Sequence, residues 1–223
     1  MTMPLRQLIL VSGRNGRGVR MVVDMETRLG LRIATFVPAD AVHDFRYPAA
    51  PGGVEPTVQR FVGGVTDRES RAPSTIHPQR GVVLLEAPIA DMAVLPRGLW
   101  SSCATPPAHE WVLEQIRPGG RPSPHEAGGL CISAMEVDPA IDDEFNEWYD
   151  EEHMSLMDAI PGMLAARRFR ATLGLPRYVA VYHLESPDVY KQRLWYEANQ
   201  TPWLRRIHRF RLRTLHLILA RAD

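Results

Sequence analysis

Three polar side chains lie at helical spacing in the second half of the sequence: Asn146, Tyr149 and His153. Separations of three, four and seven residues place side chains on one face of a helix. An imidazole with a pKa of about 6.5 can take or give a proton at neutral pH, and a phenol or amide beside it can hold an oxyanion. The spacing therefore predicts a catalytic acid/base site around His153. In the alternative interpretation, His153 only hydrogen-bonds the loop near Pro161 and ends the helix.

The helix that must carry this site is amphipathic. Asp138 and Pro139 predict its start, and Pro161-Gly162 follows its expected end near Ala159. At about 100° per residue, apolar and acidic side chains fall in opposite arcs. The apolar arc holds Ile141, Phe145, Trp148 and Leu156, and the acidic arc holds Asp143, Glu144, Glu147, Asp150 and Glu151. Because the three polar candidates lie at one border of the apolar arc, we expect them to face a cavity.

Arg168, in the strand expected after this helix, could bind a substrate carboxylate with two hydrogen bonds. It could instead pair with Glu152, which falls in the apolar arc and would be costly to bury alone. Arg170 lies on the same face of that strand and is an equivalent partner. In the alternative interpretation, these arginines have no functional role and are solvated at the edge of a sheet.

Aromatic side chains farther along the chain could complete a substrate pocket. Tyr182 and His183 are neighbours in a predicted strand, so they face opposite sides of the sheet and we expect Tyr182 to line the pocket. Trp195 and Trp203 could form a pocket wall, and His216 in the last strand is a further candidate. Sheet packing and core burial are the ordinary roles of such aromatic residues.

The elements that position these residues follow the order β-α-β-β-α-β, the split arrangement of a ferredoxin-like module. The Pro/Gly-rich segment 118–129 predicts an exposed connection before this module, which we assign to residues 128–223. Its strands are expected at 130–137, 163–172, 178–184 and 212–219, with helices after Asp138, Ser186 and Thr201.

Residues 1–120 are predicted to be a degenerate copy of the same module. Its strands are expected at 5–11, 31–37, 81–86 and 111–116, and its helices at 19–29 and 92–103. Residues 46–79 are Pro/Gly-rich and are predicted to form a lid or a mobile insert. The fold class is α+β, and the two modules could face their open sheets together as an α/β barrel with a ligand cavity between them. The chain would then be a monomeric pseudo-dimer, or else close its barrel as a homodimer.

The amino-acid composition excludes several classes of binding partner. The 26 basic and 26 acidic residues give no net charge, so neither nucleic acid nor an anionic membrane is an expected partner, and a small molecule is. No stretch has the 18 or so apolar residues of a membrane span, and the N-terminus is unlike a secretion signal, so we expect a cytoplasmic protein. The two cysteines and scattered histidines lack metal-ligand spacing, which predicts neither a metal nor another cofactor.

Several motifs of the second half resemble the EthD-like branch of the dimeric α/β-barrel superfamily. They are the helix segment 144–153 (EFNEWYDEEH), followed by Ile160-Pro-Gly162, Arg167-Arg-Phe169, Tyr178-Val-Ala-Val-Tyr182 and Thr201-Pro-Trp203. The resemblance implies a ferredoxin-like fold with a pocket. Relatives in that superfamily include cofactor-free oxygenases, polyketide cyclases, muconolactone isomerases, decarboxylases and haem-binding enzymes, so the fold alone does not select a reaction. The first half lacks a comparable helix, which predicts one equipped site per chain.

These observations favour a cofactor-independent enzyme that performs proton-transfer chemistry on an aromatic or polyketide-like substrate. Cyclisation, isomerisation, decarboxylation and C–C lysis would all fit. His153, Tyr149 and Asn146 are the expected catalytic residues, and Arg168, Tyr182, Trp195 and Trp203 the expected substrate-binding residues. The alternatives are an oxygenase, cofactor-free or haem-binding, and a protein that binds a metabolite without converting it.

Overall fold

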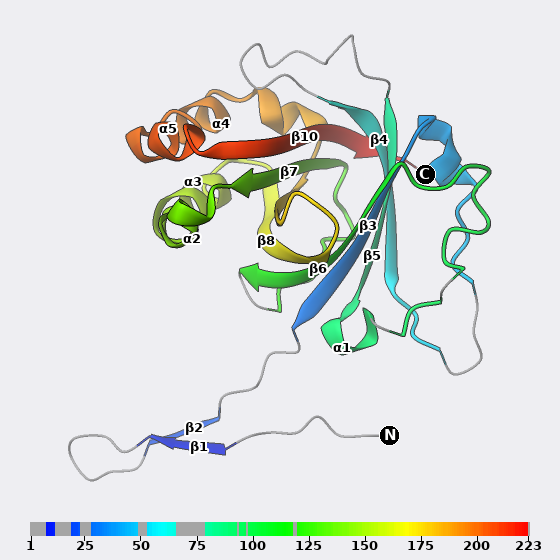
Figure 1. Cartoon of the computed structure of the whole chain (residues 1–223), viewed down its shortest axis with the longest axis horizontal. Helices are drawn as coiled ribbons and strands as arrows, with labels where there is room; N and C mark the ends of the chain where they lie inside the picture. The colour runs from blue at the N-terminus through cyan, green and yellow to red at the C-terminus, as the bar shows by residue number, and fades with distance from the viewer. Residues whose placement is uncertain are drawn as a thin grey trace.

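A closed barrel of eight antiparallel strands forms the centre of the protein (Figure 1). The structure is a computed structural model that describes residues 8–11 and 19–22 by their backbone, and residues 28–48, 53–65, 79–92, 94–96, 98–117 and 120–222. The barrel strands are β3 (Leu29–Phe36), β4 (Thr57–Val65), β5 (Arg80–Pro88), β6 (His109–Arg117), β7 (Gly129–Val137), β8 (Met163–Leu173), β9 (Tyr178–Leu184) and β10 (Arg211–Arg221). Two more strands, β1 (Leu8–Val11) and β2 (Val19–Val22), pair with each other in a separate sheet.

Each half of the chain supplies four adjacent strands of the barrel. Their spatial order is β4-β5-β3-β6 in the first half and β8-β9-β7-β10 in the second. Numbered along the chain within each half, both orders read 2-3-1-4, which is the strand order of the split βαβ arrangement. The halves join where β6 pairs with β8 and where β10 pairs with β4. The barrel therefore closes within a single chain.

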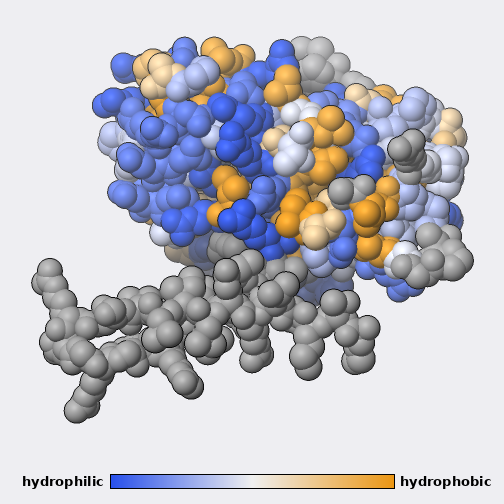
Figure 2. Space-filling view, turned by 60° about the horizontal axis from the view of Figure 1, so that its bottom comes forward, coloured by the Kyte–Doolittle hydropathy of each residue, from blue (hydrophilic) through white to orange (hydrophobic). Residues whose placement is uncertain are grey.

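Helices cover the outer face of the second half much more fully than that of the first (Figure 1). In the second half they are η2 (Pro139–Ile141), α2 (Asp142–Trp148), the π-helical turn η3 (Tyr149–His153), α3 (Met154–Asp158), η4 (Pro187–Lys191), α4 (Arg193–Ala198) and α5 (Pro202–His208). The first half has the short η1 (Ala39–His43) and α1 (Ile89–Met92). The outer side of these second-half helices, at the left in Figure 2, is mostly hydrophilic, as the acidic arc predicts.

Apolar side chains fill the barrel interior. One buried cluster takes inward-facing residues from all eight strands: Leu31, Ile33, Phe61, Val82, Leu84, Trp111, Leu113, Leu130, Ile132, Ala134, Phe169, Val179, Val181, Leu217 and Leu219. Small eight-stranded barrels are commonly filled in this way, and burial of each large side chain stabilises the fold by about 1.5–3 kcal/mol. The barrel itself is confirmed. The pocket described below lies outside this interior, between the second-half sheet and its helices, and the expected cavity between the two sheets stays a prediction.

A polar network joins the two halves at one end of the barrel interior. Arg167 on β8 forms an ion pair with Glu86 on β5 and donates a hydrogen bond from Nη2 to Ser123 Oγ at 2.6 Å. Ser123 in turn donates its backbone N–H and hydroxyl to Glu86. Beside them, Nε2 of His183 lies 3.0 Å from Oε1 of Gln59. Since Ser123 is only 4% exposed, the expectation of an exposed connection at 118–129 is wrong at this residue.

The buried position of His183 makes stability depend on pH. Burial lowers the pKa of His183 well below its usual value, and Arg167 adds to the effect. The unfolded chain therefore binds a proton near pH 6.5 that the folded chain excludes, so stability is retained above that pH and is lost as the pH falls below it. We expect this residue alone to reduce the free energy of unfolding by up to about 1.4 kcal/mol per pH unit.

Urea unfolding at about pH 7.5 and about pH 5.5 checks this expectation, with His183→Gln as the matched variant. Glutamine keeps a donor for Gln59 but cannot titrate, so the loss of stability at acid pH should be smaller in the variant. Equal losses in both proteins would contradict the assignment.

The largest differences between the predicted and the observed elements are in the first half of the chain. The expected helix at 19–29 is wrong, since β2 covers residues 19–22 and β3 begins at Leu29. The expected strand at 5–11 is present at 8–11 but pairs with β2 outside the barrel. The segment 46–79, expected to be a lid or insert, contains the barrel strand β4, and its residues 49–52 and 66–78 lie outside the described part. In the region of the helix expected at 92–103, the described residues beyond Met92, the last residue of α1, form turns and irregular structure.

Candidate functional site

A pocket of about 350 Å³ lies between the outer face of the second-half sheet and its helices. The sheet contributes Ser133, Tyr182, Arg211 and His216. The helices and the loop between α4 and α5 contribute His153, Met157, Tyr190, Trp195, Tyr196, Asn199, Gln200, Arg205 and His208. This volume is at the lower end of the range for small-molecule sites, which is about 300–1000 Å³.

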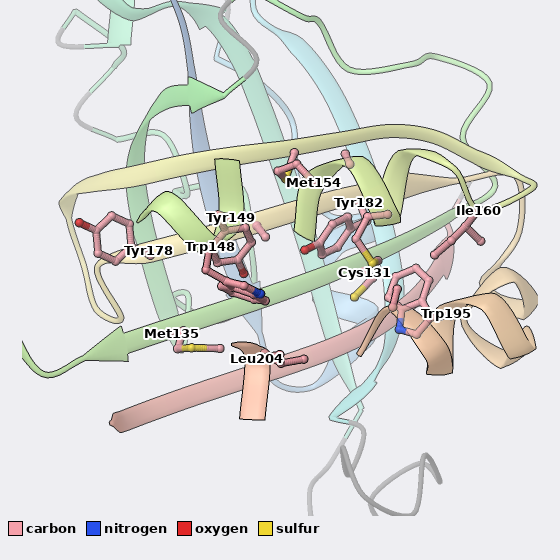
Figure 3. Packing of buried hydrophobic residues seen from close by; sticks show 14 of the residues in the cluster. Cys131, Met135, Trp148, Tyr149, Met154, Ile160, Tyr178, Tyr182, Trp195 and Leu204 are labelled. Atoms are coloured by element: carbon pink, nitrogen blue, oxygen red, sulfur yellow. The ribbon is translucent and has the colours of Figure 1, made fainter. Parts of the chain in front are cut away.

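His153 and Tyr182 meet at the wall of this pocket. Nε2 of His153 lies 3.3 Å from the hydroxyl oxygen of Tyr182. The His153 ring stacks on Trp148 with a centroid distance of 4.5 Å. The residue is 4% exposed. Figure 3 shows Tyr182 close to Cys131 and Trp195 between the sheet and the helices. An imidazole held against a phenol in this way can take a proton from a substrate bound beside it.

The π-helical turn η3 sets the orientation of His153. A π turn takes one more residue than an α turn, so the residues after it are shifted on the helix face. Accordingly Met157 is buried at 1% exposed and lines the pocket, whereas Leu156, expected in the apolar arc, is 37% exposed. Glu152 accepts hydrogen bonds from Trp148 Nε1 and Thr201 Oγ1, so its expected pairing with an arginine of β8 is wrong.

The other expected catalytic residues belong to a second group next to the pocket. Nη2 of Arg168 donates to Oδ1 of Asn146 at 2.7 Å, and its guanidinium carbon lies 4.0 Å from the centre of the Tyr149 ring. Nδ2 of Asn146 also contacts the Tyr178 hydroxyl at 3.1 Å. None of these four lines the pocket, although the Tyr149 ring touches His153 edge to face at 5.2 Å. This group fastens α2 to the sheet, and its expected roles in catalysis and substrate binding stay predictions.

The two expected wall tryptophans are in different places. Trp195 lines the pocket and contacts the rings of Tyr182 at 5.6 Å and Tyr190 at 5.2 Å. Trp203 is half-buried and packs against the hydrophobic core between helices and sheet without lining the pocket. One wall of the pocket is therefore made of aromatic rings in contact with one another.

The sequence did not predict that Ser133 and Tyr190 line the pocket, and it indicated His216 only as a further candidate. His216 lines the pocket opposite the helices, with Nε2 3.4 Å from Cys131 Sγ and its ring 5.3 Å from that of Tyr190. The alternation of β10 was a usable signal, because it places His216 on the face opposite the core residues Leu217 and Leu219. Ser133 shares that outer face on the neighbouring strand, opposite His216 in register.

The described side chains of the pocket do not form a recognisable metal or haem site. Within the described residues, no group of three or more His, Cys, Asp or Glu side chains could hold a metal ion. The two buried histidines of the pocket direct Nε2 at Tyr182 and at Cys131. A haem iron needs an axial ligand such as a ring nitrogen that points into open space. Nε2 of neither His153 nor His216 is presented in this way.

No helix in the described part of the chain is long and apolar enough to cross a membrane.

Comparison with known proteins shows the fold. No protein-family model matches the sequence, and no curated protein matches it. A solved structure described as a candidate monooxygenase from Fusobacterium nucleatum aligns with a TM-score of 0.54 at 10% identity, over 89% of this chain and 94% of that one. An anthrone oxidase-like protein aligns with a TM-score of 0.54 at 9% identity, over 89% and 93% of the two chains.

A third solved structure, described as a candidate chlorite dismutase, aligns with a TM-score of 0.51 at 9% identity, over 88% of this chain and 96% of that one. At these identities the similarity establishes a common fold and no common activity. The alignments extend over most of both chains, so the likeness includes both halves of the barrel. The chain thus has the barrel fold of monooxygenase-like and chlorite dismutase-like proteins.

Proposed function

We propose that this protein is an oxygenase that needs no bound cofactor and acts on an aromatic substrate, with His153 as its general base. The observation that carries the proposal is the buried His153–Tyr182 pair, with 3.3 Å between Nε2 and the hydroxyl oxygen, at the wall of an aromatic pocket. The descriptions of the structural neighbours as a monooxygenase and as anthrone oxidase-like favour oxygenation over proton transfer alone. The same pair could otherwise serve isomerisation or cyclisation.

The chemistry suits a substrate with an acidic CH₂ group that is conjugated to a carbonyl through aromatic rings, as in anthrone. His153 removes one proton, and the resulting carbanion is delocalised over the aromatic rings. This carbanion reduces O₂ by one electron, and the two radicals join to form a C–O bond. The hydroperoxide then loses water and becomes a ketone, so that CH₂ and O₂ give C=O and H₂O. The imidazolium returns its first proton to the peroxide anion, which gives the hydroperoxide. The neutral His153 then takes the second C–H proton and gives it to the leaving hydroxide.

The side chains around this pair support the proposal. The Tyr182 hydroxyl is hydrogen-bonded to Nε2 of His153 and fixes the orientation of the imidazole. Trp195 and Tyr190 present apolar surface to an aromatic ring. Met157 closes the helix side.

Oxygen consumption tests the proposal. The purified chain is treated with EDTA, dialysed and mixed with anthrone in an oxygen electrode. We expect uptake of one molecule of O₂ per anthrone, with anthraquinone as the product, at a rate well above the autoxidation measured without protein. An uptake equal to autoxidation would contradict the proposal, and so would equally fast conversion of anthrone under argon.

We also infer that the chain is a tandem of two ferredoxin-like modules of the EthD-like type, of which only the second is equipped for chemistry. The repeated strand order of the two halves supports this inference. Among the described residues of the first half, the short η1 lies between its first two barrel strands, where the second half has the longer run from η2 to α3 that carries His153. The short α1 lies between its last two strands, where the second half has η4, α4 and α5.

A further inference from the structure

Basic side chains gather on one side of the pocket. Arg205 and His208 belong to α5, and Arg211 begins β10. All three line the pocket, and no aspartate or glutamate is among the described residues that do so. The charged side chains among these lining residues are therefore all basic, although the chain as a whole carries no net charge.

Arg205 differs from the arginines near it on the helices. Arg206, the next residue, has Nε 2.8 Å from Glu144, and Arg193 has Nε 2.7 Å from Glu197. Within the described part of the chain, Arg205 forms no such ion pair and its side chain is exposed. A guanidinium at a pocket mouth with no internal carboxylate can pair with an anion that enters from outside.

We propose that the pocket binds aromatic carboxylates, with the carboxylate of the ligand on Arg205 and its ring against Trp195. The inference deepens the proposed function, since it rests on the same pocket and names the class of substrate. A planar carboxylate matches the fork of a guanidinium, which can donate two parallel hydrogen bonds to it. The packed rings of Trp195, Tyr182 and Tyr190 supply the apolar surface for the ring.

This arrangement also sets the direction in which the ligand enters. Arg205 is exposed at the mouth, whereas His153 is 4% exposed at the inner wall. A ligand held by its carboxylate at the mouth therefore presents its opposite end to His153 and Tyr182. Arg205 would act in binding and orientation, so its loss should raise KM much more than it lowers kcat.

One charged and one uncharged probe test the inference by their binding affinities, so the experiment does not require turnover. Anthracene carboxylate and anthracene methanol have the same ring system and differ in the charged group. Isothermal titration calorimetry of the full chain should show at least about tenfold tighter binding of the carboxylate. Added salt should weaken binding of the carboxylate and leave that of the alcohol unchanged.

The variants locate the anion site. Arg205→Gln should weaken binding of anthracene carboxylate about tenfold and leave binding of anthracene methanol as it was. The matched control is Arg209→Gln, which removes an exposed charge from the same helix end without touching the pocket. Equal affinities for the two probes, or equal effects of the two variants, would overturn the inference.

The outcome is separable from that of the proposed function. Charge-selective binding that depends on Arg205, together with no oxygen uptake, would uphold the carboxylate site and refute the oxygenase. Oxygen uptake on anthrone with no selectivity between the probes would uphold the oxygenase and refute the carboxylate site.

Discussion

Replacing His153 by glutamine is expected to lower kcat/KM for oxygen-dependent turnover by about 10²–10⁴-fold, because the chain would lose the group that removes the substrate proton. Glutamine has nearly the reach of an imidazole and can keep the hydrogen bond to the Tyr182 hydroxyl, which lies 3.3 Å from Nε2 in the structure. It cannot accept and return a proton at neutral pH. The rate should therefore fall while the pocket stays formed.

Two controls accompany this variant. His125→Gln removes an exposed histidine from the connection between the halves, and we expect it to keep full activity. Thermal unfolding of His153→Gln shows whether the protein is still folded, and binding of anthracene carboxylate shows whether the pocket is intact. A folded His153→Gln chain that binds the probe and turns over at the normal rate would exclude His153 as the base.

Replacing Glu86 by glutamine should cause the largest loss of stability, about 3–5 kcal/mol in the free energy of unfolding. The change leaves the guanidinium of Arg167, which is fully buried, without its carboxylate partner. It also weakens the two hydrogen bonds that Ser123 donates to Glu86, so the connection between the halves loses its anchor. Urea unfolding near neutral pH measures the effect.

Two further variants separate the buried pair from ordinary surface charge. Glu114→Gln breaks the ion pair with Arg28, whose side chain is 71% exposed, and should cost less than about 1 kcal/mol. The double variant Glu86→Gln with Arg167→Met removes both charges and should be more stable than Glu86→Gln alone. A loss for Glu86→Gln as small as that for Glu114→Gln would show that this network does not hold the halves together.

The second half could be predicted well because its local signals agree with its tertiary structure. Asp138 accepts a hydrogen bond from the backbone N–H of Ala140 at the helix start, and Thr201 caps α5 by accepting one from Leu204. Strong caps and Pro/Gly stops of this kind are local properties of the sequence. The alternation of β9 likewise placed Tyr182 on the helix side and His183 in the barrel.

Strand β4 was missed because its glycines have a tertiary cause. Gly63 and Gly64 belong to a Pro/Gly-rich stretch, which by itself indicates a loop. In the barrel, a Cβ on Gly63 would lie 2.1 Å from the carbonyl oxygen of Ile218 on β10. Glycine is needed there because β4 and β10 approach closely where the two halves join, and nothing local to the sequence reveals that contact.

Only part of the candidate site could be predicted from the sequence. Asn146 and His153 share a helix face, yet seven residues along a helix separate them by about 10 Å, so one face spans two environments. Asn146 faces Arg168 and Tyr178, and His153 faces the pocket. Arg205 and His216 could not be joined to His153 from the sequence, because only the fold of the second half brings their elements together.

Isotope labelling tests the central claim most directly. The EDTA-treated chain is mixed with anthrone under oxygen gas enriched in the heavy isotope, and the anthraquinone is analysed by mass spectrometry. The proposal predicts that the new carbonyl oxygen comes from the gas, and that the rate of label incorporation falls to the autoxidation level in His153→Gln. Label arriving from water instead of O₂, or label incorporated equally fast by His153→Gln, would contradict the proposal.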